Sequence, residues 1–483
     1  MFTTTPGMFV ADTQPLVLYA SDFGFSPSSS ASQNDTAIAA AITAGGTSAI
    51  IYIAADNYTI SKQISIISPN VALVSLGNYN TTIINTSSAD PTYALSVSSA
   101  ASHCLVSGIT FQGRNSVSST GGGATWAGTQ GILHRVVFQQ FGGIGLNLTG
   151  TIVELFCDDV RFVQCGMNST ATDNLVIGGS VTDSEFHRVI TAGNSAKNTT
   201  RHGITNSGSN NKFIDCHAYF CGTNGFNQVS GTNTQIIGGE WETNGNDGIL
   251  INGAKNTIMG INAFANGLND IEIDSGSSVV VGNQLSTAST HDNIACFGMT
   301  SGVIADNFIT GGPNSITANS ACTLLQIHDN TLAGATNGIS CAGTFCDIHD
   351  NTLTAGNLIE ATGANNNMIH HNSIPSGKTI TIVGASSQIK DNMGYNPVGQ
   401  VTTPGFPASG VAVVNTTGVD VTAFVANSTS AITQVQIAGA SGVYVNTNLQ
   451  IGISSWGDFR IPVGGGVKFT YAGGAPTWTW FGD

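Results

Sequence analysis

Residues 325–332 read LQIHDNTL, and residues 346–353 repeat the phrase as CDIHDNTL. Shorter versions stand on either side: VVVGNQL at 279–285, VIADNFI at 303–309, MIHHNSI at 368–374 and QIKDN at 388–392. Each phrase holds an aliphatic residue, an asparagine three positions later and, in all but the last phrase, a second aliphatic two positions further on. The phrase therefore predicts one strand, a turn that carries the asparagine, and the start of the next strand.

The asparagines of these phrases recur at intervals of 20 to 24 residues. Stacked coils place equivalent residues about 4.8 Å apart, so the asparagines can form a hydrogen-bonded ladder and adopt left-handed turns while the aliphatics stack inward. A second asparagine column half a coil away implies at least two strands per coil: Asn224, Asn246, Asn269, Asn293, Asn314, Asn337 and Asn357. The pattern predicts an all-β fold, a right-handed parallel β-helix.

Other repeat folds fit less well. A leucine-rich repeat has a similar period but needs a leucine consensus and a helical segment in each repeat, and neither is present. A β-propeller needs a period about twice as long. We therefore expect coils of about 20–24 residues between residues 69 and 395.

The two ends of the chain predict separate structures, because an open coil is a sheet edge that must be covered. Residues 1–68 hold an alanine-rich segment with Ile38 and Ile42 one turn apart, which predicts a capping helix at about 35–44. Residues 396–483 alternate apolar and polar residues and end in APTWTWFGD, which predicts a small β domain. Its aromatics form either an oligomer interface or the core of a monomeric sandwich.

Composition narrows the range of partners. The chain has 13 Lys+Arg against 28 Asp+Glu, and this acidic balance disfavours nucleic acid, whose phosphates need clustered cations. Apolar stretches reach only strand length, so we expect no membrane insertion. The N-terminus lacks the features of a secretory signal, so either a signal was removed or the protein leaves its cell by lysis. The nine cysteines contain no C-x-x-C pair and are expected to be small core residues.

Three phrases resemble the N-terminal segment of the pectate-lyase-superfamily β-helices: DFG at 22–24, NDTAIAAAI at 34–42 and IYIAADNYTI at 51–60. The last departs from the family's P-x-G-x-Y but keeps Tyr58 at the same spacing. The ending at 461–483 is similar to C-termini of phage tail proteins. The resemblance implies a homotrimeric tailspike-like protein that binds or degrades polysaccharide, either as an extracellular virion component or as an enzyme secreted by a cell.

The densest acidic and aromatic phrase is GGEWETNGNDG at 238–248. Period-two alternation points Glu240 and Glu242 outward and Trp241 inward, with His217 and Tyr219 beneath the two glutamates on the preceding coil. Two carboxylates can serve as the acid and base of a glycosidase. We expect these residues to form the catalytic and substrate-binding site: catalytic Glu240 and Glu242 with support from Asp215 and Asp247, and substrate-binding His217, Tyr219 and Trp241.

An alternative catalytic group lies on earlier coils. Calcium-dependent lyases of this fold combine a carboxylate cluster with an arginine base, and calcium prefers several oxygen ligands. The residues concerned are Asp158, Asp159, Arg161, Asp183, Glu185, His187 and Arg188. Outside that lyase hypothesis, with its calcium, no metal or cofactor is expected.

Two further patterns have simpler explanations. Asp270, Glu272 and Asp274 alternate with isoleucines and predict an amphipathic strand. His328, His349 and His370 recur every 21 residues, which the repeat explains better than a metal site does. A non-enzymatic adhesin or structural spike, with Asn/Ser/Thr faces that bind sugar, remains the rival of the hydrolase hypothesis.

Overall fold

The computed structural model describes residues 15–482 apart from positions 76, 78–82, 87–89, 117, 168–171, 197–199, 288–289, 335, 385, 394–400, 427–430 and 453–454. By its internal contacts the chain divides into two units, residues 1–295 and 296–483. The division therefore falls within the predicted coils, and the expected boundary at 395–396 lies outside the described residues. Each unit is described by itself.

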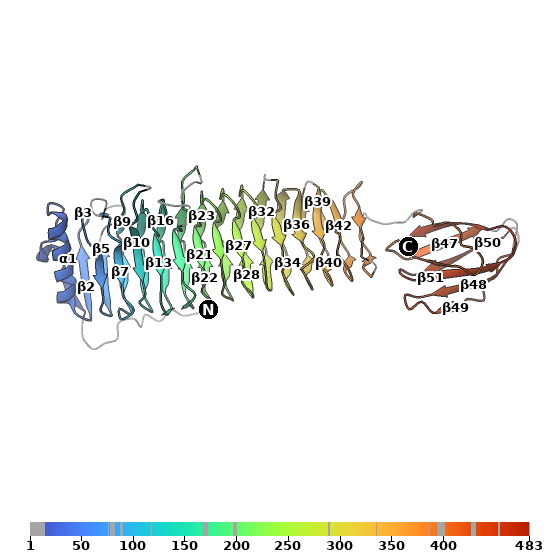
Figure 1. Cartoon of the computed structure of the whole chain (residues 1–483), viewed down its shortest axis with the longest axis horizontal. Helices are drawn as coiled ribbons and strands as arrows, with labels where there is room; N and C mark the ends of the chain where they lie inside the picture. Colours follow the sequence, from blue (N-terminus) through green and yellow to red (C-terminus); the bar gives the residue numbers. More distant parts are fainter. Residues whose placement is uncertain are drawn as a thin grey trace. The chain divides into compact units, whose positions relative to one another are not determined.

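The coils build three parallel sheets, here called A, B and C, and form a β-solenoid of about 14 turns (Figure 1). One coil shows the pattern: β25 (Gln235–Ile237) lies in sheet A, β26 (Glu240–Glu242) in sheet B and β27 (Ile249–Ile251) in sheet C. The middle residue of a sheet A or B strand points into the core, whereas in sheet C the two flanking residues do. The prediction of an all-β parallel β-helix is confirmed.

In the first unit, sheet A starts with β1 (Leu16–Tyr19), which pairs with β2 (Ala49–Ile53), which in turn pairs with β5 (Val71–Ser75). Strand stacking thus begins well before residue 69. Sheet B starts at β3 (Asn57–Thr59) and sheet C at β4 (Ile64–Ile66). In the second unit the three sheets end at β45 (Gln388–Lys390), β41 (Thr352–Leu353) and β44 (Ile380–Thr381).

The predicted asparagine ladder is present at the corner between sheets A and B. Asn330 Nδ2 donates to Asn351 Oδ1 at 2.9 Å, and Asn351 Nδ2 donates to Asn372 Oδ1 at 2.9 Å. The left-handed residue is the one before each asparagine, for example Asp350 with φ of 53°, and not the asparagine itself. The amide therefore turns inward and satisfies backbone groups that the corner leaves without strand partners.

Replacing Asn351 with alanine should destabilise the second unit by roughly 2–3 kcal/mol, because it leaves several buried donors and acceptors unsatisfied. The Asn351 amide donates to the carbonyls of Ile327 and His349 and accepts from the Asn330 backbone N–H. Thermal unfolding followed by circular dichroism measures the loss, with the exposed Asn365→Ala as control. Equal unfolding temperatures for the two variants would show that the ladder contributes nothing specific.

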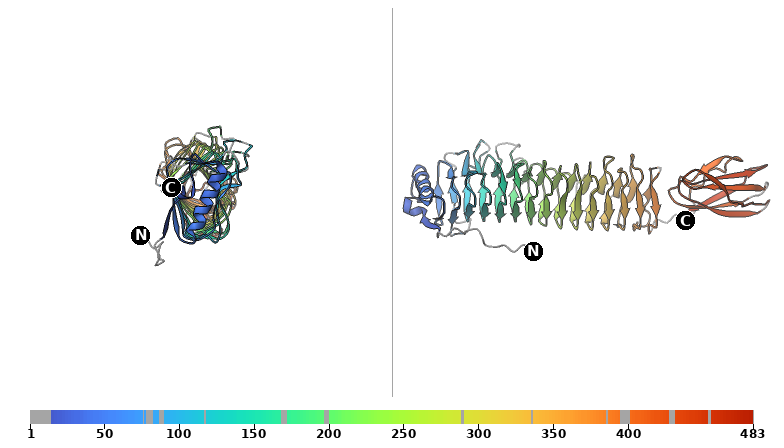
Figure 2. Two further views of the ribbon diagram at one scale, coloured as in Figure 1. Left: turned by 90° about the vertical axis from the view of Figure 1, so that its left-hand side faces the viewer. Right: turned by 90° about the horizontal axis from the view of Figure 1, so that it is seen from below.

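The N-terminal helix is longer than expected. α1 (Ala31–Gly45) begins four residues earlier because Ser30 caps it: the Ser30 hydroxyl accepts from the Gln33 N–H, and the Gln33 side chain accepts from the Ser30 N–H. It lies across the first coils, where it contacts β2 and β4 and buries Ile38 and Ile42 (Figure 2). The predicted capping role is therefore confirmed, with a corrected start.

The C-terminal residues form two antiparallel sheets. One contains β46 (Ala412–Val414), β51 (Gly466–Tyr471), β48 (Ile432–Ala438) and β49 (Tyr444–Asn446), and the other contains β50 (Trp456–Ile461), β47 (Val421–Ala426) and β52 (Thr477–Gly482). Phe469, Trp478 and Trp480 are buried between valines and isoleucines of the same domain. These aromatics thus form the domain's own core, which was one of the two expectations. All nine cysteines are buried, as predicted.

Candidate functional site

The predicted patch on sheet B exists. β23 (His217–Tyr219) pairs with β26 in the register expected from sequence, with His217 beside Glu240 and Tyr219 beside Glu242. Two positive-φ glycines, Gly238 and Gly239, form the corner before β26 and set that register. All four outward side chains are partly exposed.

The patch is built around the imidazole of His217. Its Nε2 lies 3.3 Å from a Glu242 oxygen and 3.7 Å from a Glu240 oxygen, and its ring packs at 4.6 Å against that of Tyr219. One ligand atom from each of His217, Glu240 and Glu242 lies within 4.8 Å of the other two. A nitrogen and two carboxylate oxygens so placed could hold a divalent cation such as zinc or manganese.

Three other predicted members lie elsewhere. Trp241 is 0% exposed and packs against Phe226 at 5.8 Å, so the expectation that it contacts substrate is corrected. Asp215 stands exposed at the corner before β23 with φ of 52°. Asp247 is buried on the far side of the coil, because residues 243–248 turn the chain from sheet B to sheet C.

The alternative group around residues 158–188 is divided among separate ion pairs. Arg188 pairs with Asp158, which also faces His134 at 3.6 Å. Arg161 pairs with Asp159 at 3.4 Å. These residues lie on neighbouring strands, with Asp158 in register with His187, and each arginine is paired with a carboxylate of its own.

Glu185, another acid of this group, is paired as well. It bonds Lys212 at 2.9 Å and His187 at 3.2 Å. The hydrogen bond from Lys212 lowers the pKa of Glu185, which keeps this carboxylate ionised.

A cluster that the sequence did not single out lies on sheet C. Its members, called the sheet C carboxylates, are Asp247, Glu272 and Asp274. The side-chain nitrogen of Asn269 donates to Asp247 Oδ1 at 3.2 Å and to Glu272 Oε2 at 2.7 Å. Glu272 is the outward residue of β30 (Ile271–Ile273), and Asp274 follows two positions later. One amide thus holds two carboxylates side by side, with a third next to them.

Burial and mutual repulsion favour protons in this cluster. Burial, and after it the negative charges of Asp247 and Asp274, together raise the pKa of Glu272 to about 7. Burial raises the pKa of Asp247 to about 6, opposed by the hydrogen bonds from Asn269. Near neutral pH the cluster therefore holds a carboxylic acid beside carboxylates, which is the combination that acid–base catalysis needs.

Asp270 corrects the expectation of an amphipathic strand. It precedes β30 at the corner, where it is 0% exposed and accepts from Asn266 Nδ2 at 3.0 Å and from Asn293 Nδ2 at 2.9 Å. Burial raises its pKa to about 7. It faces the interior of the coil and belongs to the structure's core.

Polar side chains continue across the same face of sheet C. Arg201 forms a two-point ion pair with buried Asp173, at 2.8 and 2.7 Å, and the Thr205 hydroxyl donates to the same carboxylate. Burial lowers the pKa of neighbouring His202 to about 4, so its imidazole is neutral. Asn227 lies at 3.4 Å from that ring and in register with Thr205. Leu250 stands in register between Asn227 and Glu272, and the polar groups on its two sides, these residues and the sheet C carboxylates, are here called the sheet C track.

The recurrent histidines stack as the repeat predicts. The rings of His328 and His349 are 4.9 Å apart, and those of His349 and His370 are 5.0 Å apart, nearly parallel in both cases. The first two each bond the aspartate that follows them at 2.8 Å. They form a surface ladder on sheet A.

Comparisons with known proteins bear on the fold of the chain. No family model and no curated protein sequence matches this chain. The tailspike protein of E. coli bacteriophage HK620, solved with a pentasaccharide, superposes with a TM-score of 0.54 at 12% identity, covering 96% of this chain and 93% of that one. The chain has the fold of right-handed parallel β-helix proteins.

Two bacterial structures show the same similarity. The A-module of the Azotobacter vinelandii mannuronan C-5 epimerase AlgE4 gives a TM-score of 0.53 at 17% identity, covering 77% of this chain and 99% of that one. The surface adhesin PfbA of Streptococcus pneumoniae gives 0.53 at 12% identity, covering 69% and 92%. At such identities the likeness establishes the fold.

Proposed function

We propose that the chain binds a polysaccharide and hydrolyses its glycosidic bonds at the sheet C carboxylates. The observation that carries the proposal is the Asn269 amide that joins Asp247 to Glu272 beside Asp274. Glycoside hydrolysis needs one carboxylic acid and one carboxylate at the scissile bond.

Each carboxylate has a role in this mechanism. Glu272, protonated near neutral pH, donates its proton to the leaving glycosidic oxygen as that bond breaks. Asp274, the more exposed neighbour, accepts a proton from the water that forms the new bond to the anomeric carbon. Asp247 is a positioning residue: its charge favours the proton on Glu272, and Asn269 orients both.

The sheet C track supports a carbohydrate substrate. Asn227 and neutral His202 offer uncharged donors and acceptors, which match sugar hydroxyls. A net charge of −15 favours a glycan with few acidic groups. Two of the structural neighbours are named for action on mannuronan or were solved with an oligosaccharide, which also supports this substrate class.

Two rival proposals differ from this one, the first in its site and the second in its chemistry. Glu240 and Glu242 with His217 offer a second carboxylate pair on sheet B. A glycan-binding adhesin without catalysis uses the same polar surfaces but cleaves nothing. Both are tested together with the main proposal.

The test is product release from a panel of bacterial and plant polysaccharides by the full chain. New reducing ends without ultraviolet absorbance are expected for a hydrolase. Absorbance near 235 nm would indicate elimination, as in a lyase, and would overturn the proposed reaction. Binding without release from any glycan would favour the adhesin.

We also propose that the protein is a homotrimeric, extracellular tail-type or secreted component assembled through its C-terminal domain. Trp456, Phe424 and Phe481 expose 74%, 42% and 36% of their surface on the sheet of β50, β47 and β52. Exposed aromatics of this kind are enriched in protein interfaces. Sedimentation of the full chain should give three times 49.5 kDa, and the mass of a single chain would contradict the assembly. The described residues contain no helix long and apolar enough to cross a membrane.

A further inference from the structure

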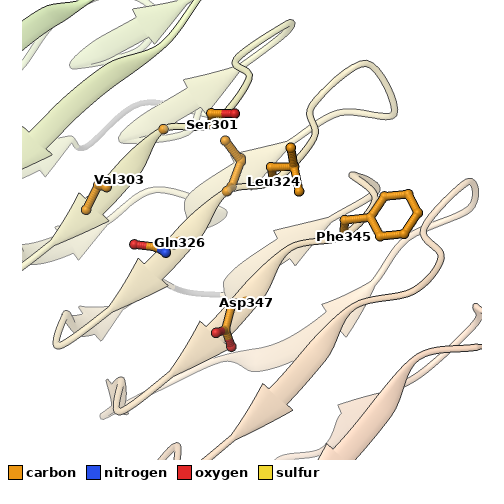
Figure 3. A pocket seen from close by; sticks show the side chains of 8 residues that line it. Ser301, Val303, Leu324, Gln326, Phe345 and Asp347 are labelled. Atoms are coloured by element: carbon orange, nitrogen blue, oxygen red, sulfur yellow. The ribbon is translucent and has the colours of Figure 1, made fainter.

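Sheet A of the second unit carries a pocket of about 340 Å³, and none of its lining residues belongs to either carboxylate site (Figure 3). Its floor comes from three neighbouring strands, β34 (Val303–Ala305), β37 (Gln326–His328) and β40 (Asp347–His349), whose first residues are in register. Leu324 and Phe345 rise beside Gln326 and Asp347 at the corner that precedes these strands (Figure 3). The lining therefore combines an apolar side with polar groups.

The two apolar side chains are unusual at their positions. Leu324 and Phe345 expose 55% and 57% of their surface and have φ of 58° and 56°. Left-handed backbone is disfavoured for bulky residues, and exposed apolar surface adds nothing to folding. The equivalent corner on other coils carries polar residues: Asn70, His103, Gln130, Glu154, Asp183, Asn210, Asn233, Lys255, Ser301 and Asn366.

The polar groups of the pocket share one direction. Gln326 and Asp347 pair across neighbouring strands and point outward together. His370 Nε2 lies 3.0 Å from Asp347 Oδ1, which fixes the carboxylate and leaves its second oxygen available for a ligand donor. Side chains one strand apart are about 4.8 Å from each other, a spacing that suits adjacent hydroxyl groups of one sugar ring.

We infer that this pocket binds one pyranose ring of a neutral glycan, with the C–H face of the sugar on Phe345 and Leu324 and its hydroxyls on Gln326 and Asp347. The pocket volume lies at the small end of ligand sites, where one or two sugar rings fit. The carboxylate at Asp347 disfavours an acidic sugar.

The inference rests on the glycan class of the proposed function and does not require that the chain cleave its ligand. The test is saturation-transfer NMR of the full chain with the methyl glycosides of glucose, galactose, mannose and N-acetylglucosamine. The double variant Leu324→Asn/Phe345→Asn removes the apolar side. Asparagine accepts left-handed backbone, so the unfolding temperature of this variant should be unchanged or higher. Phe308→Ser, which removes another exposed phenyl ring, is the control.

We expect at least one glycoside to show transfer, mainly to its ring C–H protons, and to lose most of it in the double variant but not in Phe308→Ser. The pocket assignment is overturned if no glycoside shows transfer or if transfer survives in the double variant. It is also overturned if that variant changes the molecular mass of the particle, because the two side chains would then hold subunits together. Hydrolysis by the full chain without transfer from any glycoside would leave the sheet C proposal standing and reject the pocket. Pocket binding without any hydrolysis would reject the proposed catalysis and leave the pocket standing.

Discussion

Replacing Glu272 with glutamine should lower the rate of glycosidic-bond cleavage by about 10²–10⁴-fold, the usual contribution of a general acid. Glutamine keeps the size of the side chain and can still bond Asn269, but it has no proton to give to the leaving oxygen. Binding of the polysaccharide should change little, so the loss should appear in kcat and not in KM. Initial rates of reducing-end release give kcat and KM. The affinity for the polysaccharide is measured on the same preparations.

The pH dependence of the cleavage rate is a second test of Glu272 as the acid. Burial and the flanking charges raise the pKa of Glu272 to about 7, so its proton is present below that pH and lost above it. The wild-type rate should therefore fall as the pH rises above about 7. Glu240→Gln and Glu242→Gln are the matched controls, since they alter the carboxylate pair on sheet B. If those variants lose the activity while Glu272→Gln retains it, the chemistry belongs to sheet B.

The fold could be predicted because the same pattern of an aliphatic residue and an asparagine recurs from coil to coil. An aliphatic followed three positions later by an asparagine places one inward side chain and one corner amide, and the structure confirms both. The pairing of Glu240 with His217 was also predictable, since the corners before their two strands recur at the period of the coil. Sequence periodicity thus predicts the direction of side chains within an uninterrupted strand.

The site on sheet C could not be predicted from alternation, because corners interrupt it. Asp270, Glu272 and Asp274 share a phase in sequence, yet Asp270 lies in the turn before β30 and points inward between two amides. Asp247 was expected beside Glu240, but the turn after β26 carries it to sheet C. Aligning the phrases NDGI at 246–249 and LNDI at 268–271 by their strands places Asp247 level with Asn269, a signal that was available.

Buried Asp270 should make the first unit less stable at high pH. Its folded pKa of about 7 exceeds the usual value of 3.8, so the unfolded chain ionises first as the pH rises. Stability contributed by the bound proton is fully present below about pH 4 and is lost between about pH 4 and 7. A difference of three pKa units corresponds to about 4 kcal/mol.

The stability of Asp270→Asn relative to the native chain should therefore be up to about 4 kcal/mol greater at pH 8 than at pH 4. At pH 4 Asp270 is neutral and both of its oxygens can still accept from Asn266 and Asn293, whereas an amide has one acceptor oxygen, so the variant loses one of these hydrogen bonds at both pH values. Asparagine already occupies the equivalent position on the next coil, at Asn293. Urea unfolding at both pH values measures the effect, with the exposed Asp306→Asn as control. A gain of equal size at both pH values would show that shape, and not the buried charge, sets the stability at this corner.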